Sequence, residues 1–162
     1  MCDYSLMNVP NRLAREGEEL VIHRFPTGSL GLASPRDVKC SANTRSTTRK
    51  SAWARLREFF NPPVVQPVAA VCIPPGARLQ LQDIPIRLQH EAGVGPVAEV
   101  TFTQITAAAH SYRDAVRFHN GREIRLQEIR EGQLVKVLDL SGAEELDLAQ
   151  LREREELIFR LR

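Results

Sequence analysis

The chain has 162 residues, of which 43% are hydrophobic and 26% are charged. This length and composition are typical of one domain that buries its core without metals or disulfides, so we expect a single domain over residues 1–162. The formal net charge is +2, which excludes a protein that binds polyanions through bulk charge. No apolar run approaches the roughly 20 residues of a membrane-spanning helix, and the N-terminus lacks the features of a signal peptide. We therefore expect a soluble, cytoplasmic protein.

The first part of the sequence shows a hairpin pattern. Residues 20–25 have the β-branched and aromatic side chains typical of a strand. The turn sequence Pro-Thr-Gly at 26–28 then leads back along residues 29–33. A second apolar run over 64–73 has the length and β-branching of a buried strand.

A basic segment over residues 36–60 separates these strands. It carries seven basic and two acidic residues, a net charge of +5. Its Ser- and Thr-rich part, residues 36–51, is typical of a loop. Apolar side chains at i, i+3 and i+7 over residues 50–60 predict a short amphipathic helix. Such a short helix is not stable alone in water, so it must dock on something.

Alternation of apolar and polar side chains predicts further strands in the middle of the sequence. The alternation is clear over residues 77–82 and continues over 84–88 past a proline that marks an edge or a bend. The alternation returns over residues 97–105. Apolar side chains occur there at both odd and even positions, which is typical of a strand covered on both faces.

The last third of the sequence predicts a hairpin, a third strand and a helix. Asn120-Gly121 between alternating segments predicts a type I′ turn, because both central residues of that turn need a positive φ. Residues 134–138 then complete a three-stranded antiparallel meander. Ser141 and Glu144 form a capping box for a C-terminal helix over 141–162.

These elements together predict a mainly β fold. We expect a small antiparallel barrel or sandwich of about seven to nine short strands, with a short inserted helix and a C-terminal helix.

The basic segment is the best candidate for contact with another molecule. Its aromatic and basic faces suit a groove of a partner protein or an anionic membrane surface. Nucleic acid is the partner it supports least, because regularly placed aromatic residues for base stacking are missing. The alternative is that its apolar side chains fold back and cap the β-structure. The expected binding residues are Arg49, Lys50, Trp53, Arg55, Leu56, Arg57, Phe59 and Phe60.

A small enzyme is the rival hypothesis. The sequence has three cysteines without close spacing, Cys2, Cys40 and Cys72. Their odd number argues against a disulfide framework and for a reducing compartment. Cys2 or Cys72 could act with His23 or His110 in thiol or metal chemistry. The histidines show no metal-ligand spacing, so we expect no cofactor, no metal site and no small-molecule ligand, and a non-enzymatic binding module is favoured.

Four stretches of the sequence form a recognisable pattern. They are the opening Met-Cys-Asp-Tyr-Ser-Leu, His-Arg-Phe-Pro-Thr-Gly-Ser-Leu-Gly at 23–31, Val-Cys-Ile-Pro-Pro-Gly at 71–76, and Glu-Gly-Gln-Leu-Val-Lys-Val-Leu at 131–138. The pattern resembles a group of small uncharacterised bacterial proteins and touches most of the sequence outside the basic segment. The resemblance implies a bacterial, cytoplasmic setting. It implies no biochemical function and assigns a role to no residue.

Overall fold

The computed structural model describes residues 6, 8–45, 67–105 and 112–142, and all structural statements below concern these residues. Their helices and strands, in sequence order, are β1 (Asn11–Leu13), β2 (Glu19–Arg24), β3 (Leu30–Ala33), α1 (Pro35–Arg45), β4 (Ala70–Cys72), β5 (Arg78–Gln82), α3 (Ile86–Ala92), β6 (Ala98–Gln104), β7 (Asp114–Phe118), β8 (Glu123–Arg125), the 3-10 turn η2 (Leu126–Glu128) and β9 (Leu134–Asp139).

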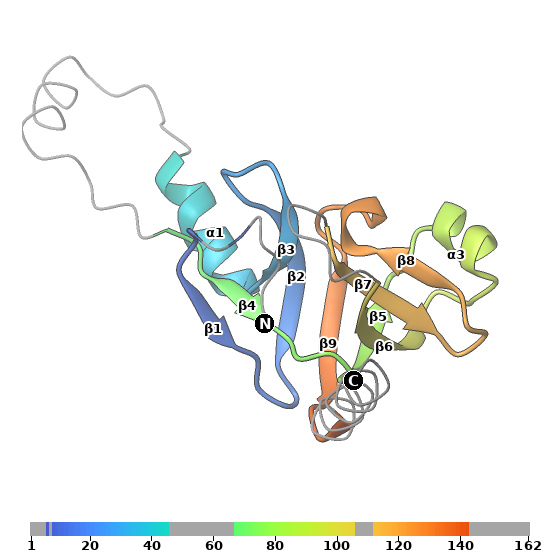
Figure 1. Ribbon diagram of the computed structural model, residues 1–162. Helices are drawn as coiled ribbons and strands as arrows, with labels where there is room; N and C mark the ends of the chain where they lie inside the picture. The colour runs from blue at the N-terminus through green and yellow to red at the C-terminus, as the bar shows by residue number, and fades with distance from the viewer. Residues whose placement is uncertain (1–5, 7, 46–66, 106–111, 143–162) are drawn as a thin grey trace, which may run out of the picture.

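The nine described strands form one mixed sheet in the order β1-β4-β3-β2-β9-β5-β6-β7-β8. β1 and β4 run parallel, and every other neighbouring pair is antiparallel. The fold is therefore mainly β, as predicted, but its sheet is not purely antiparallel. No pairing among the described strands joins β1 to β8, so the predicted barrel is not closed by strand pairing. α1 lies at the end of the molecule that holds β1, β3 and β4, and α3 lies at the opposite end (Figure 1).

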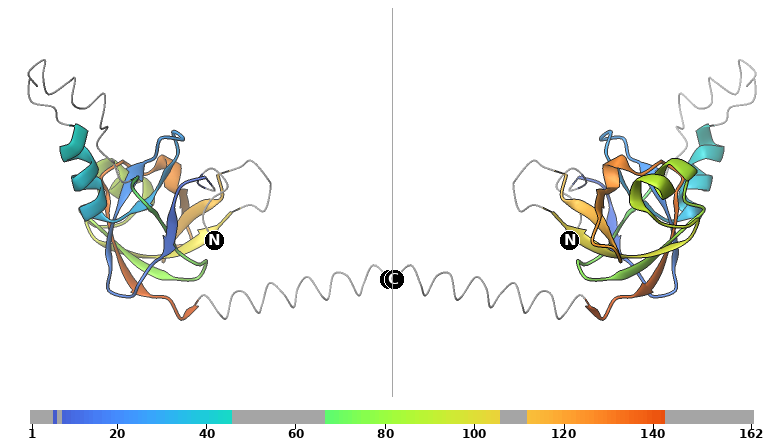
Figure 2. Two further views of the ribbon diagram at one scale, coloured as in Figure 1. Left: turned by 90° about the vertical axis from the view of Figure 1, so that its left-hand side faces the viewer. Right: turned by 90° about the vertical axis from the view of Figure 1, so that its right-hand side faces the viewer.

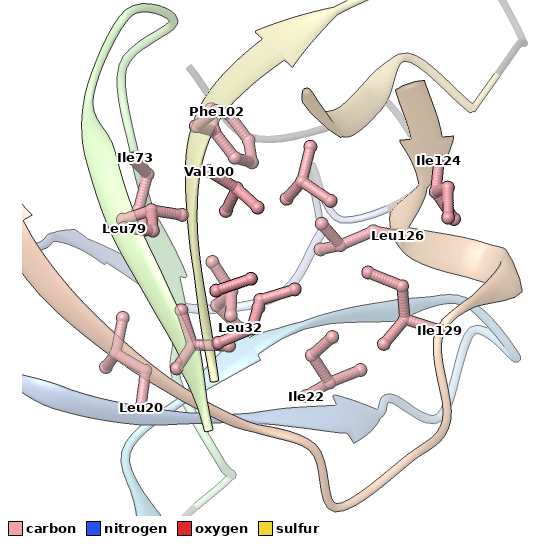
Figure 3. Close-up of a cluster of buried hydrophobic side chains, with 14 of the residues drawn as sticks. Leu20, Ile22, Leu32, Ile73, Leu79, Val100, Phe102, Ile124, Leu126 and Ile129 are labelled. Carbon is pink, nitrogen blue, oxygen red and sulfur yellow. The ribbon is translucent and has the colours of Figure 1, made fainter. Parts of the chain in front are cut away.

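The main hydrophobic core lies on the inner face of the curved sheet (Figures 2 and 3). Leu20 and Ile22 of β2, Leu79 of β5, and Val100 and Phe102 of β6 point into it, each no more than 3% exposed. These residues belong to both halves of the sheet. Burial of this one shared cluster therefore holds the two halves together.

Several predicted strands are confirmed. The strands expected over 20–25, 77–82 and 97–105 are β2, β5 and β6, but β6 buries one face and not the expected two. The first hairpin is confirmed as well, and Gly28 with a φ of 85° makes the turn between its arms. Of the strand predicted over 64–73, the structure shows β4, and residues 64–66 lie outside its described part.

The Gln127 side chain also joins the two halves of the sheet. The Leu30 N–H of β3 donates to Gln127 Oε1 at 2.9 Å, and Gln127 Nε2 donates to the Leu30 carbonyl oxygen at 2.7 Å. One amide thus satisfies both main-chain groups of a residue that is 3% exposed. It occupies the place that a neighbouring strand would take.

The loop predicted over 36–51 is wrong for residues 36–45, which belong to α1. Pro35 sits in the first turn, where its missing N–H is not needed. Asp37 in the same turn suits the positive end of the helix dipole. The polar composition hid a half-buried anchor, because Val38 packs against a second hydrophobic cluster.

The strand predicted over 84–88 is also wrong, because these residues enter α3. Leu88 and Ala92 are buried at i and i+4, which is helical spacing. Ile86, which the predicted alternation of buried and exposed side chains places on the buried face, is 72% exposed. Gly93 ends the helix with a φ of 67°.

β7 and β8 form the predicted hairpin, but its turn is not type I′. Asn120 does not have a positive φ, whereas Gly121 has a φ of 83°. The Gly121 N–H donates to the Phe118 carbonyl oxygen at 2.9 Å. The Asn120 side chain donates to the Ala92 carbonyl oxygen at 2.7 Å. This bond gives Asn120 a tertiary partner at the end of α3 and fixes the turn in its observed form.

The predicted three-stranded meander is wrong. After β8 the backbone forms η2 and turns Leu126 and Ile129 into the core. It then crosses to the middle of the sheet, where β9 pairs with β2 and β5. The burial of these two side chains takes the backbone away from the edge on which a meander would continue.

The predicted helices over 50–60 and beyond Gly142 lie outside the described residues. Within the described part, neither helix combines the length and the apolar composition needed to cross a bilayer.

Candidate binding cleft

A cleft of about 650 Å³ lies at the end of the molecule that carries α1. Its walls are residues 8–10 before β1, residues 23–27 at the end of β2, Ser41 of α1, residues 67–68 before β4, and Glu131. The volume is within the range of about 300–1,000 Å³ that is typical of ligand pockets. Several segments that are distant in sequence therefore meet around one binding-sized space.

The floor of the cleft is apolar because it shares residues with the second hydrophobic cluster. Phe25 is 2% exposed and belongs to both. Val9 and Val68 pack against the same cluster and line the cleft as well. Val38 packs against this cluster from α1, so the helix that carries Ser41 is held in place beside the cleft.

The polar groups of the cleft converge on one carboxylate. The Arg24 main-chain N–H donates to Glu131 Oε1 at 3.0 Å. His23 Nδ1 lies 3.6 Å from Glu131 Oε1, and Arg24 Nε lies 3.6 Å from Glu131 Oε2. We call these three donors the β2 cradle. Two of them are charged, His23 only when it is protonated.

The fold explains why an N–H group is available there. Along β2, the Ile22 N–H still donates to the Gln133 carbonyl oxygen at 3.0 Å. The next N–H on that side belongs to Arg24, and the Glu131 carboxylate takes the place of a backbone acceptor. The Arg24 guanidinium is held over the following turn by a 2.8 Å bond from Nη1 to the Gly28 carbonyl oxygen. His23 packs edge-on against Phe25, with ring centroids 5.2 Å apart.

The basic segment 36–60 is rooted beside this cleft. Its described part is α1, on which Arg36 and Lys39 are exposed. α1 ends at Arg45, four residues after Ser41, and the described backbone resumes at Pro67. Ser41 and Pro67 both line the cleft. The predicted binding residues lie between these two points, outside the described residues. They are Arg49, Lys50, Trp53, Arg55, Leu56, Arg57, Phe59 and Phe60.

The cysteine predictions need one correction. Cys72 is disulfide-bonded, a bond that the expectation of no disulfide framework did not include. The bond means that Cys72 does not present a thiolate to His23. Cys2 and His110 lie outside the described residues.

Sequence reasoning named His23 but missed Arg24 and Glu131. The two residues are 107 positions apart and belong to no motif. Their meeting depends on the crossing of the backbone from η2 to β9, which the predicted meander did not contain. The only local signal was the Glu-Gly turn before residues 134–138, and it was interpreted as a hairpin turn.

Comparisons of the sequence with protein-family models, with curated proteins and with solved structures gave no match.

Proposed function

We propose that this protein is a non-enzymatic binding module that contacts a partner protein through the basic segment 36–60 and the adjacent cleft. The observation that supports this proposal is the position of Ser41 and Pro67, which flank the segment's binding residues and line the same cleft. In this proposal, a partner bound by the segment also contacts the cleft. The two surfaces then act as one site.

The charge of the segment selects an acidic partner. Its net charge of +5 exceeds the +2 of the whole protein, so the rest of the molecule is net acidic. Opposite charge at the contact steers encounter and orients the partner. A flat anionic membrane surface also satisfies the charge, but it cannot enter a concave cleft. The cleft thus favours a protein segment with acidic side chains over a bilayer.

The enzyme hypothesis has less support than before. The disulfide of Cys72 removes one of its two candidate thiols. The alternative remains a small metal- or thiol-dependent enzyme with His23 or His110, and thiol-reactive labelling together with metal analysis of untagged protein tests it.

The test of the binding proposal is a charge-removal variant with a matched control. In the segment variant, Arg49, Lys50, Arg55 and Arg57 are replaced by Gln. The control variant loses the same charge from exposed arginines outside the segment, namely Arg15, Arg87, Arg122 and Arg125. Peptides are selected from a random displayed library on the unmodified protein, and their affinities are measured by fluorescence anisotropy.

We expect acidic peptides that bind the segment variant about tenfold more weakly and the control variant within about twofold, since each exposed pair contributes about 0.2–1 kcal/mol. Equal binding by both variants would remove the proposal. Binding to phosphatidylserine vesicles without selection of acidic peptides would replace the protein partner with a membrane.

A further inference from the structure

The carboxylate of Glu131 is held loosely by groups that are themselves firmly placed. The donors of the β2 cradle belong to a strand that is paired on both sides up to Ile22. The acceptor is a side chain that is 46% exposed. Two of its three contacts are 3.6 Å long, which is longer than a hydrogen bond. The main chain of the cradle is therefore held by strand pairing and not by the carboxylate.

The cradle has the chemistry of a carboxylate receptor. A main-chain N–H, a guanidinium and an imidazole ring that is charged when protonated are donors that bind carboxylates. They face a cleft of about 650 Å³, which has room for a further side chain. The apolar floor beside them, from Val9, Phe25 and Val68, suits the carbon atoms that carry such a carboxylate.

We infer that the β2 cradle is a carboxylate-binding site and that Glu131 occupies it until a carboxylate of the partner displaces it. The identity of that partner rests on the proposed function, in which the basic segment selects an acidic protein. The bound carboxylate belongs to an acidic side chain or to the C-terminus of the partner. In both cases Glu131 competes with the ligand and lowers its apparent affinity.

Four variants of the full-length protein test this inference. Glu131→Gln removes the charge of the competing side chain, and Arg24→Gln removes one charged donor. Glu91→Gln and Arg87→Gln are the matched controls, because Arg87 and Glu91 form an exposed ion pair on α3 at the other end of the molecule, 2.9 Å apart. Three small probes are compared. N-acetylglutamate α-methylamide has a side-chain carboxylate, and N-acetylalanine has a terminal carboxylate. N-acetylglutamine methylamide has no carboxylate and is the neutral probe. Binding is followed over millimolar concentrations by the amide NMR signal of Arg24.

The expected result is a shift of the Arg24 amide signal by a carboxylate probe and not by the neutral one. Glu131→Gln should bind that probe about two- to fivefold more tightly, which is the range that an exposed ion pair can withhold. Arg24→Gln should bind it several-fold more weakly, and both controls should match the unmodified protein. Comparison of the two carboxylate probes then separates an acidic side chain from a C-terminus.

Unchanged or weaker binding by Glu131→Gln would overturn the inference and leave Glu131 as a cap for the end of β2. Probe shifts confined to α1 would overturn it too. These outcomes are independent of the segment variant, because the cradle variants keep all charges of residues 36–60. Loss of peptide binding in the segment variant with no effect of Glu131→Gln would retain the proposed function and reject the cradle.

Discussion

The Gln127 side chain offers a direct test of how the sheet is held together. Gln127→Ala removes both bonds to the main chain of Leu30, at 2.9 and 2.7 Å. Leu30 is 3% exposed, so its N–H and carbonyl groups are left largely without water. An unsatisfied buried group costs about 1–3 kcal/mol, so we expect the free energy of unfolding to fall by about 2–4 kcal/mol. For a protein of this size that lowers the Tm by about 5–15 °C.

Urea unfolding followed by circular dichroism measures this loss, with an unchanged dependence on urea concentration. Gln127→Met keeps most of the side-chain volume without the bonds, so it should lose nearly as much as the alanine variant. Gln80→Ala is the control, because the half-buried Gln80 amide accepts a hydrogen bond from another side chain, Gln82 Nε2 at 3.2 Å, and not from the main chain. It should change stability by less than about 0.5 kcal/mol. If Gln127→Ala unfolds like the control and the Leu30 amide exchanges no faster, the amide does not support the sheet.

Two further predictions concern other parts of the fold. Gly142→Ala places a Cβ 2.7 Å from the Gly76 carbonyl oxygen, a main-chain atom, so we expect a loss of about 1–3 kcal/mol in urea unfolding; Gly95→Ala meets its nearest atom at 3.9 Å and should be nearly neutral. The hydrogen bond from Arg12 lowers the pKa of Glu18 from 4.5. Glu18 therefore stabilises the fold above about pH 4.5 and loses this effect as the pH falls through its folded-state pKa. The free energy of unfolding of the unmodified protein should exceed that of Glu18→Gln by up to about 1 kcal/mol at pH 7, and the difference should shrink as the pH falls below about 4.5; a difference that does not shrink would contradict this.

The elements that could be predicted from the sequence are those whose burial pattern is local. β2, β5 and β6 alternate because one face of each meets the core, and period-two patterns record that directly. α1 and α3 were missed for the opposite reason. Among the side chains that the structure describes, α1 is anchored by the half-buried Val38 and α3 by the buried Leu88 and Ala92, so their patterns resemble a loop or a strand.

The cleft could not be predicted because its polar groups meet only through the tertiary fold. His23 and Arg24 lie at the end of β2, where the next acceptor comes from a loop 107 residues later. The sequence places Glu131 in a turn, which is correct, but no local rule tells which strand end that turn will face. The same holds for Asn120, whose turn type depends on a carbonyl group at the end of α3.

The central position of β9 has a consequence for biosynthesis. β1 to β4 form one side of the sheet and β5 to β8 the other. β9 joins the two sides, because it pairs with β2 on one side and with β5 on the other. While the ribosome has made only the residues before Leu134, each side is an open sheet whose inner edge is unpaired and prone to association with other polypeptides. The contacts made by β9 close large loops, so these contacts form late and slowly during folding. Nascent forms of this protein should therefore depend on chaperones until β9 has emerged and joined the two sides.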